Sequence, residues 1–132
     1  MKYILDTNII IYYLKGEYDS IRRHLFHIPS DSILIPSIVL AELYFGADNS
    51  SDTERNKRAI DVFISAFEVI DFDKAAAAYY GRIRSELKRA GTPIGANDML
   101  IAALALAHNA VLVTHNVREF SFVSGLITED WV

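Results

Sequence analysis

Short apolar segments that stop at a polar residue, with a helix expected directly afterwards, most constrain what this chain can fold into. The first is the apolar run 3–5, which ends at Asp6 and is followed by Thr7 and Asn8, two residue types that cap helix N-termini. The apolar residues 9–14 come next. This stretch therefore indicates a strand, a turn and a helix.

The same arrangement recurs along the chain. Residues 33–35 are apolar and end at Pro36, after which Ser37 can cap a helix that carries apolar residues at helical spacing. Later segments predict further strands at 69–70 and 111–113 and an edge strand that begins at Ile127. They also predict helices over 19–26, 53–66, 74–89 and 99–107, the last starting at Asn97 or Asp98.

Strands that alternate with helices predict an α/β fold, a three-layer α/β/α sandwich on a mostly parallel central sheet. The chain has 132 residues, the length of one domain, and no segment long enough to be a linker, so we expect a single domain over 1–132. In sheets of this kind, ligands bind outside the carboxyl ends of the strands. The polar residues that follow the strands are therefore the first candidates for a site.

Several classes of protein are excluded by residue content. The chain has no cysteine, which rules out thiolate catalysis, zinc ribbons and iron–sulfur ligation. Its longest strongly apolar helical run, 99–107, is far shorter than the ~20 residues that span a bilayer. Asp6 interrupts the apolar region that a secretory signal would need. We therefore expect a soluble, cytoplasmic protein without a membrane partner.

Three carboxylates stand at comparable places in this pattern. Asp6 follows the first strand, Glu42 lies in the helix after the second strand, and Asp98 lies at the start of the apolar helix. Each is embedded in apolar sequence, where an unpaired carboxylate is costly to bury, and few cationic residues lie near it. Oxygen ligands without cysteine or a histidine pair suit Mg²⁺, for which Mn²⁺ can substitute.

Each acid also has a structural explanation that needs no metal. Asp6 and Asp98 could serve only as N-caps, and Glu42 could be a solvent-facing helix residue. The coincidence of all three with entries into helices favours a shared site. Neutral polar residues occupy similar places, which makes them candidates for supporting the acids: Thr7, Asn8, Ser37, Thr114 and Asn116.

A resemblance to a known family rests on motifs that run from end to end of the chain. The chain resembles the PIN-domain toxins of the VapC family in four segments: Leu-Asp-Thr-Asn at 5–8, Ala-Glu-Leu at 41–43, Pro-Ile-Gly-Ala-Asn-Asp at 93–98, and Leu-Val-Thr-His-Asn at 112–116 followed by Glu119-Phe120. Each motif is weak alone, and together they are specific.

The resemblance implies a metal-dependent endoribonuclease that is the toxin of a type II toxin–antitoxin pair. Asp6, Glu42 and Asp98 would be its catalytic, metal-binding acids, and Thr7, Asn8 and Thr114 would lie around them. It also implies structured RNA substrates, tRNA especially, cut in a loop. A VapB-type antitoxin would fold onto the toxin and block its acidic pocket, within a larger complex that contains toxin homodimers and binds operator DNA through the antitoxin.

One position departs from the fuller family pattern. Many PIN domains carry a fourth acid shortly after the last core strand, where this chain has Asn116. An amide oxygen can bind a metal or orient a water, but it brings no charge. We therefore expect one tightly held ion, with any second ion recruited alongside the RNA phosphate.

The chain carries four more acidic than basic residues, which gives a net charge of −4, the wrong sign for bulk attraction to RNA. Basic residues concentrate on two predicted helices, and either these are ordinary solvated faces or they contact phosphates. The candidates for RNA contact are Arg55, Lys57 and Arg58 on one helix, and Arg82, Arg84, Lys88 and Arg89 on the other. The metal ion would supply positive charge at the point of cleavage.

Other functional classes fit less well. A phosphoryl-accepting receiver needs a late lysine, and none follows Lys88. A haloacid-dehalogenase-type phosphatase needs Asp-x-Asp, and here Asn8 replaces the second acid. The four histidines lack the spacing of a helical zinc pair, and we expect no catalytic role for them. The open alternative is a non-catalytic PIN-domain module that binds RNA or protein, for which Asn116 leaves room.

Overall fold

Five short strands form one sheet in the order β3-β2-β1-β4-β5, in a computed structural model that describes all residues from 1 to 132. Every neighbouring pair is parallel, as the alternation of strands and helices predicts. The strands are β1 (Tyr3–Leu5), β2 (Ile33–Pro36), β3 (Glu68–Ile70), β4 (Val111–Val113) and β5 (Thr128–Glu129). The predicted strands are thus all present, and the last pairs through the Ile127 carbonyl but begins at Thr128.

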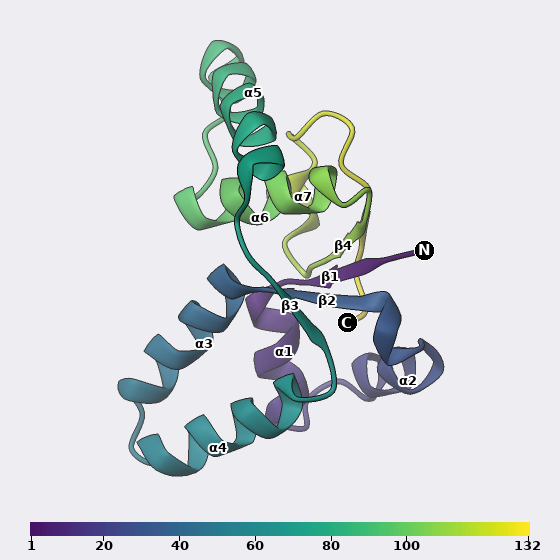
Figure 1. The fold of residues 1–132 in the computed structure, drawn as a ribbon, viewed down its shortest axis with the longest axis vertical. Helices are drawn as coiled ribbons and strands as arrows, with labels where there is room; N and C mark the ends of the chain where they lie inside the picture. Colours follow the sequence, from purple (N-terminus) through teal and green to yellow (C-terminus); the bar gives the residue numbers. More distant parts are fainter.

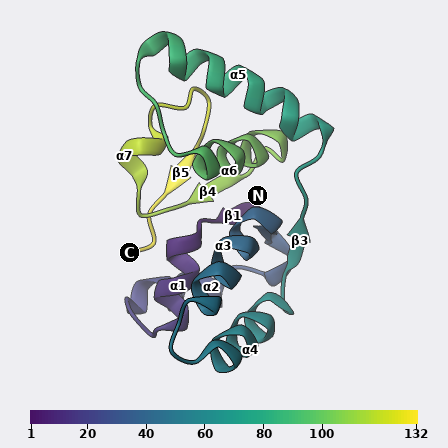
Figure 2. The ribbon, with the colours of Figure 1, turned by 90° about the vertical axis from the view of Figure 1, so that its left-hand side faces the viewer.

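Helices cover both faces of this sheet, which confirms the α/β fold. They are α1 (Thr7–Leu14), α2 (Asp19–His27), α3 (Ser37–Asp48), α4 (Thr53–Ile64), α5 (Lys74–Ala90), α6 (Ala96–Ala107) and α7 (Val117–Phe120), with a short 3-10 turn at Ser30–Ser32. Figures 1 and 2 show α5 and α6 on one side of the strands and α1, α2 and α4 on the other. This distribution follows from right-handed crossovers, since the chain moves outward through β2 to β3 and then returns to β4.

The sheet and one helix form the centre of the hydrophobic core. The strands β2 and β4 are buried along their whole length, as expected for a parallel sheet covered on both faces. Residues 101–105 of α6 are all buried too, so the helix predicted to be apolar nearly all round does lie inside the protein. The middle of α6 is therefore held inside the core, while its first turn is exposed or half-buried.

Three helix starts differ from the sequence prediction. The N-cap of α1 is Asp6, whose side chain accepts from the Thr7 amide, so neither Thr7 nor Asn8 caps it. Ser37 is the first residue of α3 and makes no capping bond. The helix α6 begins at Ala96, so Asp98 lies within its first turn and is not its cap. An Asp98 side chain without a capping role is free to face a site.

Two further boundaries follow local chemistry. The helix α5 ends at Gly91, which has the positive φ of 70° that favours glycine, as the sequence predicts. The short helix α7 is not predicted, because four residues are too few to show a helical period.

None of the helices combines the length and the apolar character that a bilayer-spanning segment requires.

Candidate metal centre

The first acid of the candidate site is anchored where two neighbouring strands end. Asp6 follows β1, and its amide donates to the carbonyl of Val113 in β4 at 2.9 Å. Its Oδ1 accepts from the Thr7 amide and its Oδ2 from the Thr114 hydroxyl, each at 2.8 Å. Asp6 is 6% exposed and Thr114 is fully buried. Three hydrogen bonds thus fix both the backbone and the carboxylate of Asp6.

The second acid is joined to the first through one threonine. Glu42 lies in α3, and its Oε1 accepts from the Thr7 hydroxyl at 2.8 Å. Thr7 is itself nearly buried. Because its amide binds Asp6 while its hydroxyl binds Glu42, Thr7 holds the two carboxylates next to each other. Thr7, one of the neutral residues selected from the sequence, therefore contacts two of the three acids.

The third acid faces the other two from α6. The pKa of Asp98 is raised from 3.8 to about 6, mainly by burial and in smaller part by the negative charges of Asp6, Glu119 and Glu42. Burial, opposed by the hydrogen bonds from Thr114 and Thr7, also raises the pKa of Asp6. Carboxylates perturb each other's pKa in this way only when they lie close together. The structure therefore brings Asp6, Glu42 and Asp98 to one place.

A fourth acid, Glu119, belongs to this cluster and was missed as a site residue by the sequence reasoning. It lies in α7, where its Oε1 accepts from the Gly95 amide at 3.0 Å and its Oε2 from the Asn116 side chain at 2.6 Å. Its charge raises the pKa of both Asp6 and Asp98. Asn116 and Glu119 are three residues apart, one helical turn, which is the sequence signal that could have found it.

Glu119 thus adds a fourth carboxylate beside the three acids expected from the sequence. Asn116 stands where many PIN domains have the fourth acid, but Glu119 brings a fourth negative charge from the next turn of the chain. The reason for limiting the site to one tightly held ion was the missing charge at Asn116. Glu119 supplies a charge next to that position, and the number of ions stays a prediction.

No cationic side chain compensates the four acids, which we call the acidic cluster (Asp6, Glu42, Asp98 and Glu119). The ion pairs of the chain lie elsewhere: Arg22–Asp19, Lys57–Asp48, Arg82–Glu86 and His115–Asp130. A group of one buried and three half-buried carboxylates without a counter-charge suits a hard divalent cation such as Mg²⁺. No three of these side chains lie close enough to enclose one ion as they stand. Glu42 and Glu119 are instead turned to their hydrogen-bond donors.

The remaining polar candidates lie at different depths. Asn8 is exposed on α1. Asn116 donates to Glu119 through its side chain, and its amide donates to the Thr114 hydroxyl at 3.0 Å. His115, between these two, pairs with Asp130 at 2.9 Å and lies edge-on to Tyr12. Its ring is therefore engaged away from the acidic cluster.

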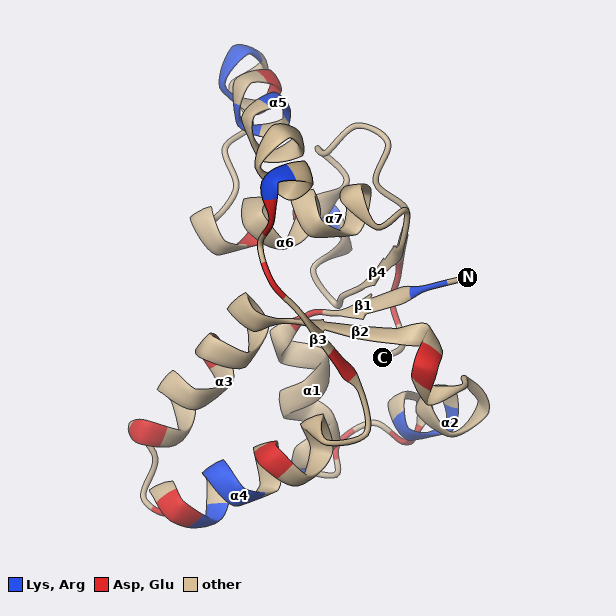
Figure 3. Cartoon of the chain, in the orientation of Figure 1, with Lys and Arg blue, Asp and Glu red and all other residues tan.

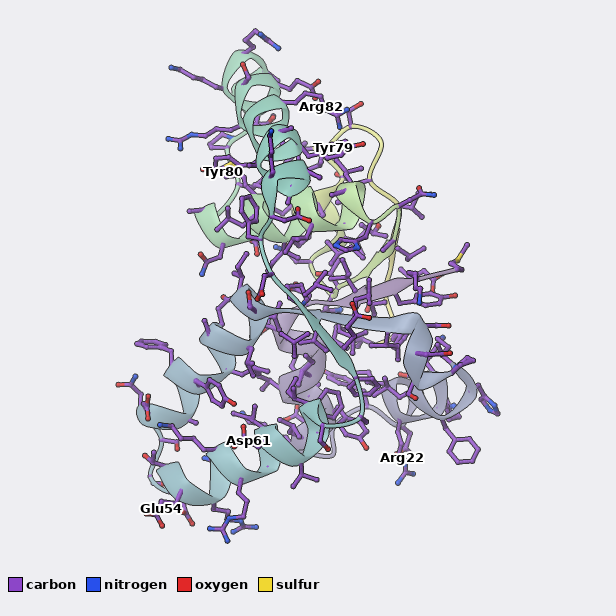
Figure 4. All side chains as sticks on the ribbon, viewed as in Figure 1. Arg22, Glu54, Asp61, Tyr79, Tyr80 and Arg82 are labelled. Carbon is purple, nitrogen blue, oxygen red and sulfur yellow. The ribbon has the colours of Figure 1, made fainter.

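The basic residues selected from the sequence separate into two groups. Figure 3 shows them on α4 and α5, near opposite ends of the long axis of the molecule. On α5, Arg82 lies over the Tyr79 ring, 5.2 Å from its centroid, and also pairs with Glu86. Arg84 donates to the Tyr80 hydroxyl. Figure 4 shows the labelled Tyr79, Tyr80 and Arg82 together on this helix.

The other group borders a groove of about 940 Å³ between α1, α2 and α4. Arg55 and Arg58 line it together with Arg22, whose side chain is labelled in Figure 4, and with apolar residues that include Leu25 and Phe63. A second hollow of about 340 Å³ adjoins it through shared lining residues and reaches Glu42. We refer to the two together as the α1/α2/α4 groove.

Comparison with known proteins adds independent findings. The PIN domain family model matches residues 3–125. The chain is 45% identical over 132 residues to Ribonuclease VapC2 of Rickettsia felis, covering 99% of this chain and 98% of that protein. It is 44% identical over 131 residues to the tRNA(fMet)-specific endonuclease VapC of Shigella flexneri, with the same coverage.

Solved structures give the same result for the fold. The crystal structure of VapBC2 from Rickettsia felis, bound to a DNA fragment from its promoter, superposes with a TM-score of 0.95 at 44% identity and covers all of both chains. The structure of DNA-bound VapBC from Salmonella typhimurium gives a TM-score of 0.94 at 42% identity, covering 100% of this chain and 99% of that one.

Proposed function

The chain belongs to the PIN-domain family and, within it, to the VapC ribonuclease toxins, as the resemblance in its motifs indicated, and on that premise we propose that the acidic cluster is its metal-dependent catalytic centre. One observation carries the proposal. Asp6 is nearly buried among Glu42, Asp98 and Glu119, and no cationic side chain pairs with any of the four. Such a cluster needs a cation to be stable in its ionised form.

The chemistry of the donors fits Mg²⁺, with Mn²⁺ as a substitute. The residues that would hold the ion are Asp6, Glu42, Asp98 and Glu119, all of which offer only carboxylate oxygens. A bound divalent ion supplies the charge that polarises the scissile phosphodiester and lowers the pKa of an attacking water. No covalent intermediate on the protein is required.

The chain's own residues orient the centre. Thr7 and Thr114 donate to Asp6 and thereby keep its carboxylate in one position. Thr7 also donates to the Oε1 of Glu42, so that Asp6 after β1 and Glu42 in α3 keep a fixed position relative to each other. Side chains held in place before the substrate arrives need no reorganisation during the reaction, which is how such a site lowers a barrier.

The non-catalytic alternative loses its support. It rested on the neutral Asn116, and Glu119 restores the missing negative charge. The relatives that match over the full length are named as ribonucleases and endonucleases.

Incubation of the purified protein with total RNA tests the metal centre. We expect cleavage with Mg²⁺ and none with EDTA, and we expect Asp98→Asn to reduce the cleavage rate by at least about a hundredfold, because it removes a charge that only the metal and the transition state need. Asp71→Asn is the matched control, since Asp71 is an exposed acid outside the acidic cluster. Cleavage that survives EDTA, or full activity in Asp98→Asn, would refute the assignment.

We propose tRNA as the substrate class, because a relative of 44% identity is named as specific for tRNA(fMet). Arg82, Arg84 and Lys88 on α5 would contact phosphates on one side of the acidic cluster, and Arg55 and Arg58 on α4 on the other. Since the two groups lie near opposite ends of the molecule, only an extended RNA could reach both. A tRNA substrate would also place the protein in the cytoplasm.

We propose that a VapB-type antitoxin occupies the α1/α2/α4 groove, because structurally similar chains are found in VapBC complexes. The groove offers apolar side chains such as Leu25 and Phe63, which suit a peptide, and it continues to Glu42. A peptide lying there would also cover Arg55 and Arg58 and keep RNA from them. A segment lying in it would therefore end at the acidic cluster and block it.

We also propose homodimers within such a complex, which would bind operator DNA through the antitoxin. Phe45 on α3 is 72% exposed and is a candidate contact between two copies, because a large apolar side chain in water favours burial against a partner.

A further inference from the structure

A continuous chain of hydrogen bonds links two acids of the acidic cluster through Asn116. The Asn116 amide donates to Thr114 Oγ1 at 3.0 Å, and this hydroxyl donates to Asp6 Oδ2 at 2.8 Å. The Asn116 side chain donates through Nδ2 to Glu119 Oε2 at 2.6 Å. The Asn116 backbone therefore contacts Thr114, which donates to Asp6, and the Asn116 side chain contacts Glu119 directly.

The backbone contact settles the direction of the threonine hydroxyl. Thr114 is fully buried, and its oxygen accepts the Asn116 amide proton. The hydroxyl proton is then left to be donated to Asp6, which accepts it. With one lone pair on the Asn116 amide and its proton on the Asp6 carboxylate, which can only accept, the hydroxyl has one favourable direction.

The side-chain contact settles the place of Glu119. Its two oxygens are held separately, Oε1 by the Gly95 amide at the start of α6 and Oε2 by Asn116. Both donors are neutral, so they orient the carboxylate without cancelling its charge. Without Asn116, Glu119 would keep one donor and could rotate about it, toward solvent and away from Asp98.

We propose that Asn116 is a positioning residue for the metal centre, and that its neutral amide is what the site requires at this position. An aspartate in its place has no donor for Glu119 and would put a fifth carboxylate against it. Like charges at hydrogen-bond distance repel, so Glu119 would be driven out of the cluster. The acid that many PIN domains carry here would therefore weaken this particular site.

The inference rests on the proposed function, because it concerns how the residues of that centre are held. Residues that orient metal ligands typically change metal affinity or activity by about 10- to 100-fold when they are replaced. Asn116→Ala should lie in that range, and Asn116→Asp should be at least as impaired.

The test measures Mn²⁺ binding by calorimetry on metal-free protein without RNA, together with kcat and KM for RNA cleavage. We expect Asn116→Ala and Asn116→Asp to weaken Mn²⁺ binding about tenfold or more and to lower kcat with little change in KM. The matched control is Asn49→Ala, which removes an exposed asparagine whose side chain donates to the Phe45 carbonyl and to none of the four acids. Circular dichroism and unfolding of the metal-free variants check that each one is folded.

A double-mutant cycle shows whether Asn116 acts through Glu119. In a Glu119→Gln background, Asn116→Ala should cost almost nothing further in Mn²⁺ affinity, because the group that it positions is already gone. Additive losses, unchanged binding in Asn116→Ala, or tighter binding in Asn116→Asp would each overturn the proposal.

Failure of the proposed function gives a different result. Wild-type protein that binds no Mn²⁺ and cleaves RNA in EDTA would remove the metal centre itself, and the role of Asn116 with it. Wild-type protein that binds Mn²⁺ while both Asn116 variants bind it equally well would remove only the positioning role.

Discussion

At the scale of single residues, Asp98 shows that the ionised acidic cluster destabilises the folded protein when no metal is bound. Folding raises its pKa from 3.8 to about 6, first through burial and then through Asp6, Glu119 and Glu42. An ionised Asp98 is therefore less favourable in the folded protein than in the unfolded chain. The ionised acidic cluster therefore lowers the free energy of unfolding until a cation binds.

This has a consequence for the pH dependence of the metal-free protein. Between pH values of about 4 and 6 the folded state holds more protons than the unfolded state, so the free energy of unfolding falls as pH rises through this interval. The raised pKa of Asp6 acts in the same direction. Because solvent still screens the partly buried Asp98, we expect its share to be about 1 to 2 kcal/mol by pH 7.

Denaturant unfolding of the Asp98→Asn variant in EDTA measures this share. The variant should be more stable than wild type at pH 7 by about 1 to 2 kcal/mol and should lose that advantage near pH 4. Mg²⁺ should raise the unfolding midpoint of wild type and raise that of the variant much less. Asp71→Asn is the control and should follow wild type. The same change in the free energy of unfolding between pH 4 and 6 in wild type and in Asp98→Asn would contradict this explanation.

At the scale of elements, the two basic helices differ in how free their charges are. Arg82 on α5 is already paired with Glu86, whereas Arg84 contacts only the neutral Tyr80 hydroxyl and Lys88 has no ion-pair partner. If α5 contacts RNA phosphates, Arg84 and Lys88 are the residues with charge to offer.

The salt dependence of RNA binding tests the role of α5. Neutralising both Arg84 and Lys88 to glutamine should weaken binding and reduce the slope of log affinity against log salt by about 1.5, the contribution of two phosphate contacts. The matched control neutralises two exposed basic residues outside α5. They are Lys2, directly before β1, and Arg23 on α2. An unchanged slope in the α5 variant would exclude these two contacts.

Elements also show why some local structure could not be predicted. The helix over 74–89 and its stop at Gly91 follow from periodicity and from the conformational freedom of glycine. The helix α7 does not, because Glu119 in it is held by Gly95, which lies 24 positions earlier in the chain. The short spacing of Asn116 and Glu119 is a local signal, but no local pattern carries the contact between Glu119 and Gly95. Glu119 was consequently quoted as part of a motif but missed as a member of the site.

At the scale of the whole molecule, the α1/α2/α4 groove and the acidic cluster form one connected surface. The groove passes Ala59, an exposed residue of α4 that borders both of its hollows, and reaches Glu42. A peptide bound along it could therefore close the centre without competing for the basic face of α5. Inhibition and the RNA contacts of α5 would then be separable by mutation, whereas a peptide in the groove would cover Arg55 and Arg58.

A bulky substitution at Ala59 tests that separation. Ala59→Arg should weaken antitoxin binding about tenfold or more, because the side chain fills the passage between the two hollows, while RNA cleavage by the free toxin persists. The matched control is Ala75→Arg, at an exposed alanine of α5. Titration of antitoxin against cleavage activity gives the measurement. Equal inhibition of both variants would place the antitoxin elsewhere.

The sequence by itself determined the parallel α/β fold, the order of its elements and the places of Asp6, Glu42 and Asp98 in them, because local apolar patterns mark where strands end and helices begin. It also determined the family, through motifs spread over the whole chain. Only the tertiary structure decided that Glu119 joins these acids, that Thr7 bridges two of them, and that Asn116 holds the fourth. These are contacts between side chains on different elements, and their partners are set by how the sheet and helices pack.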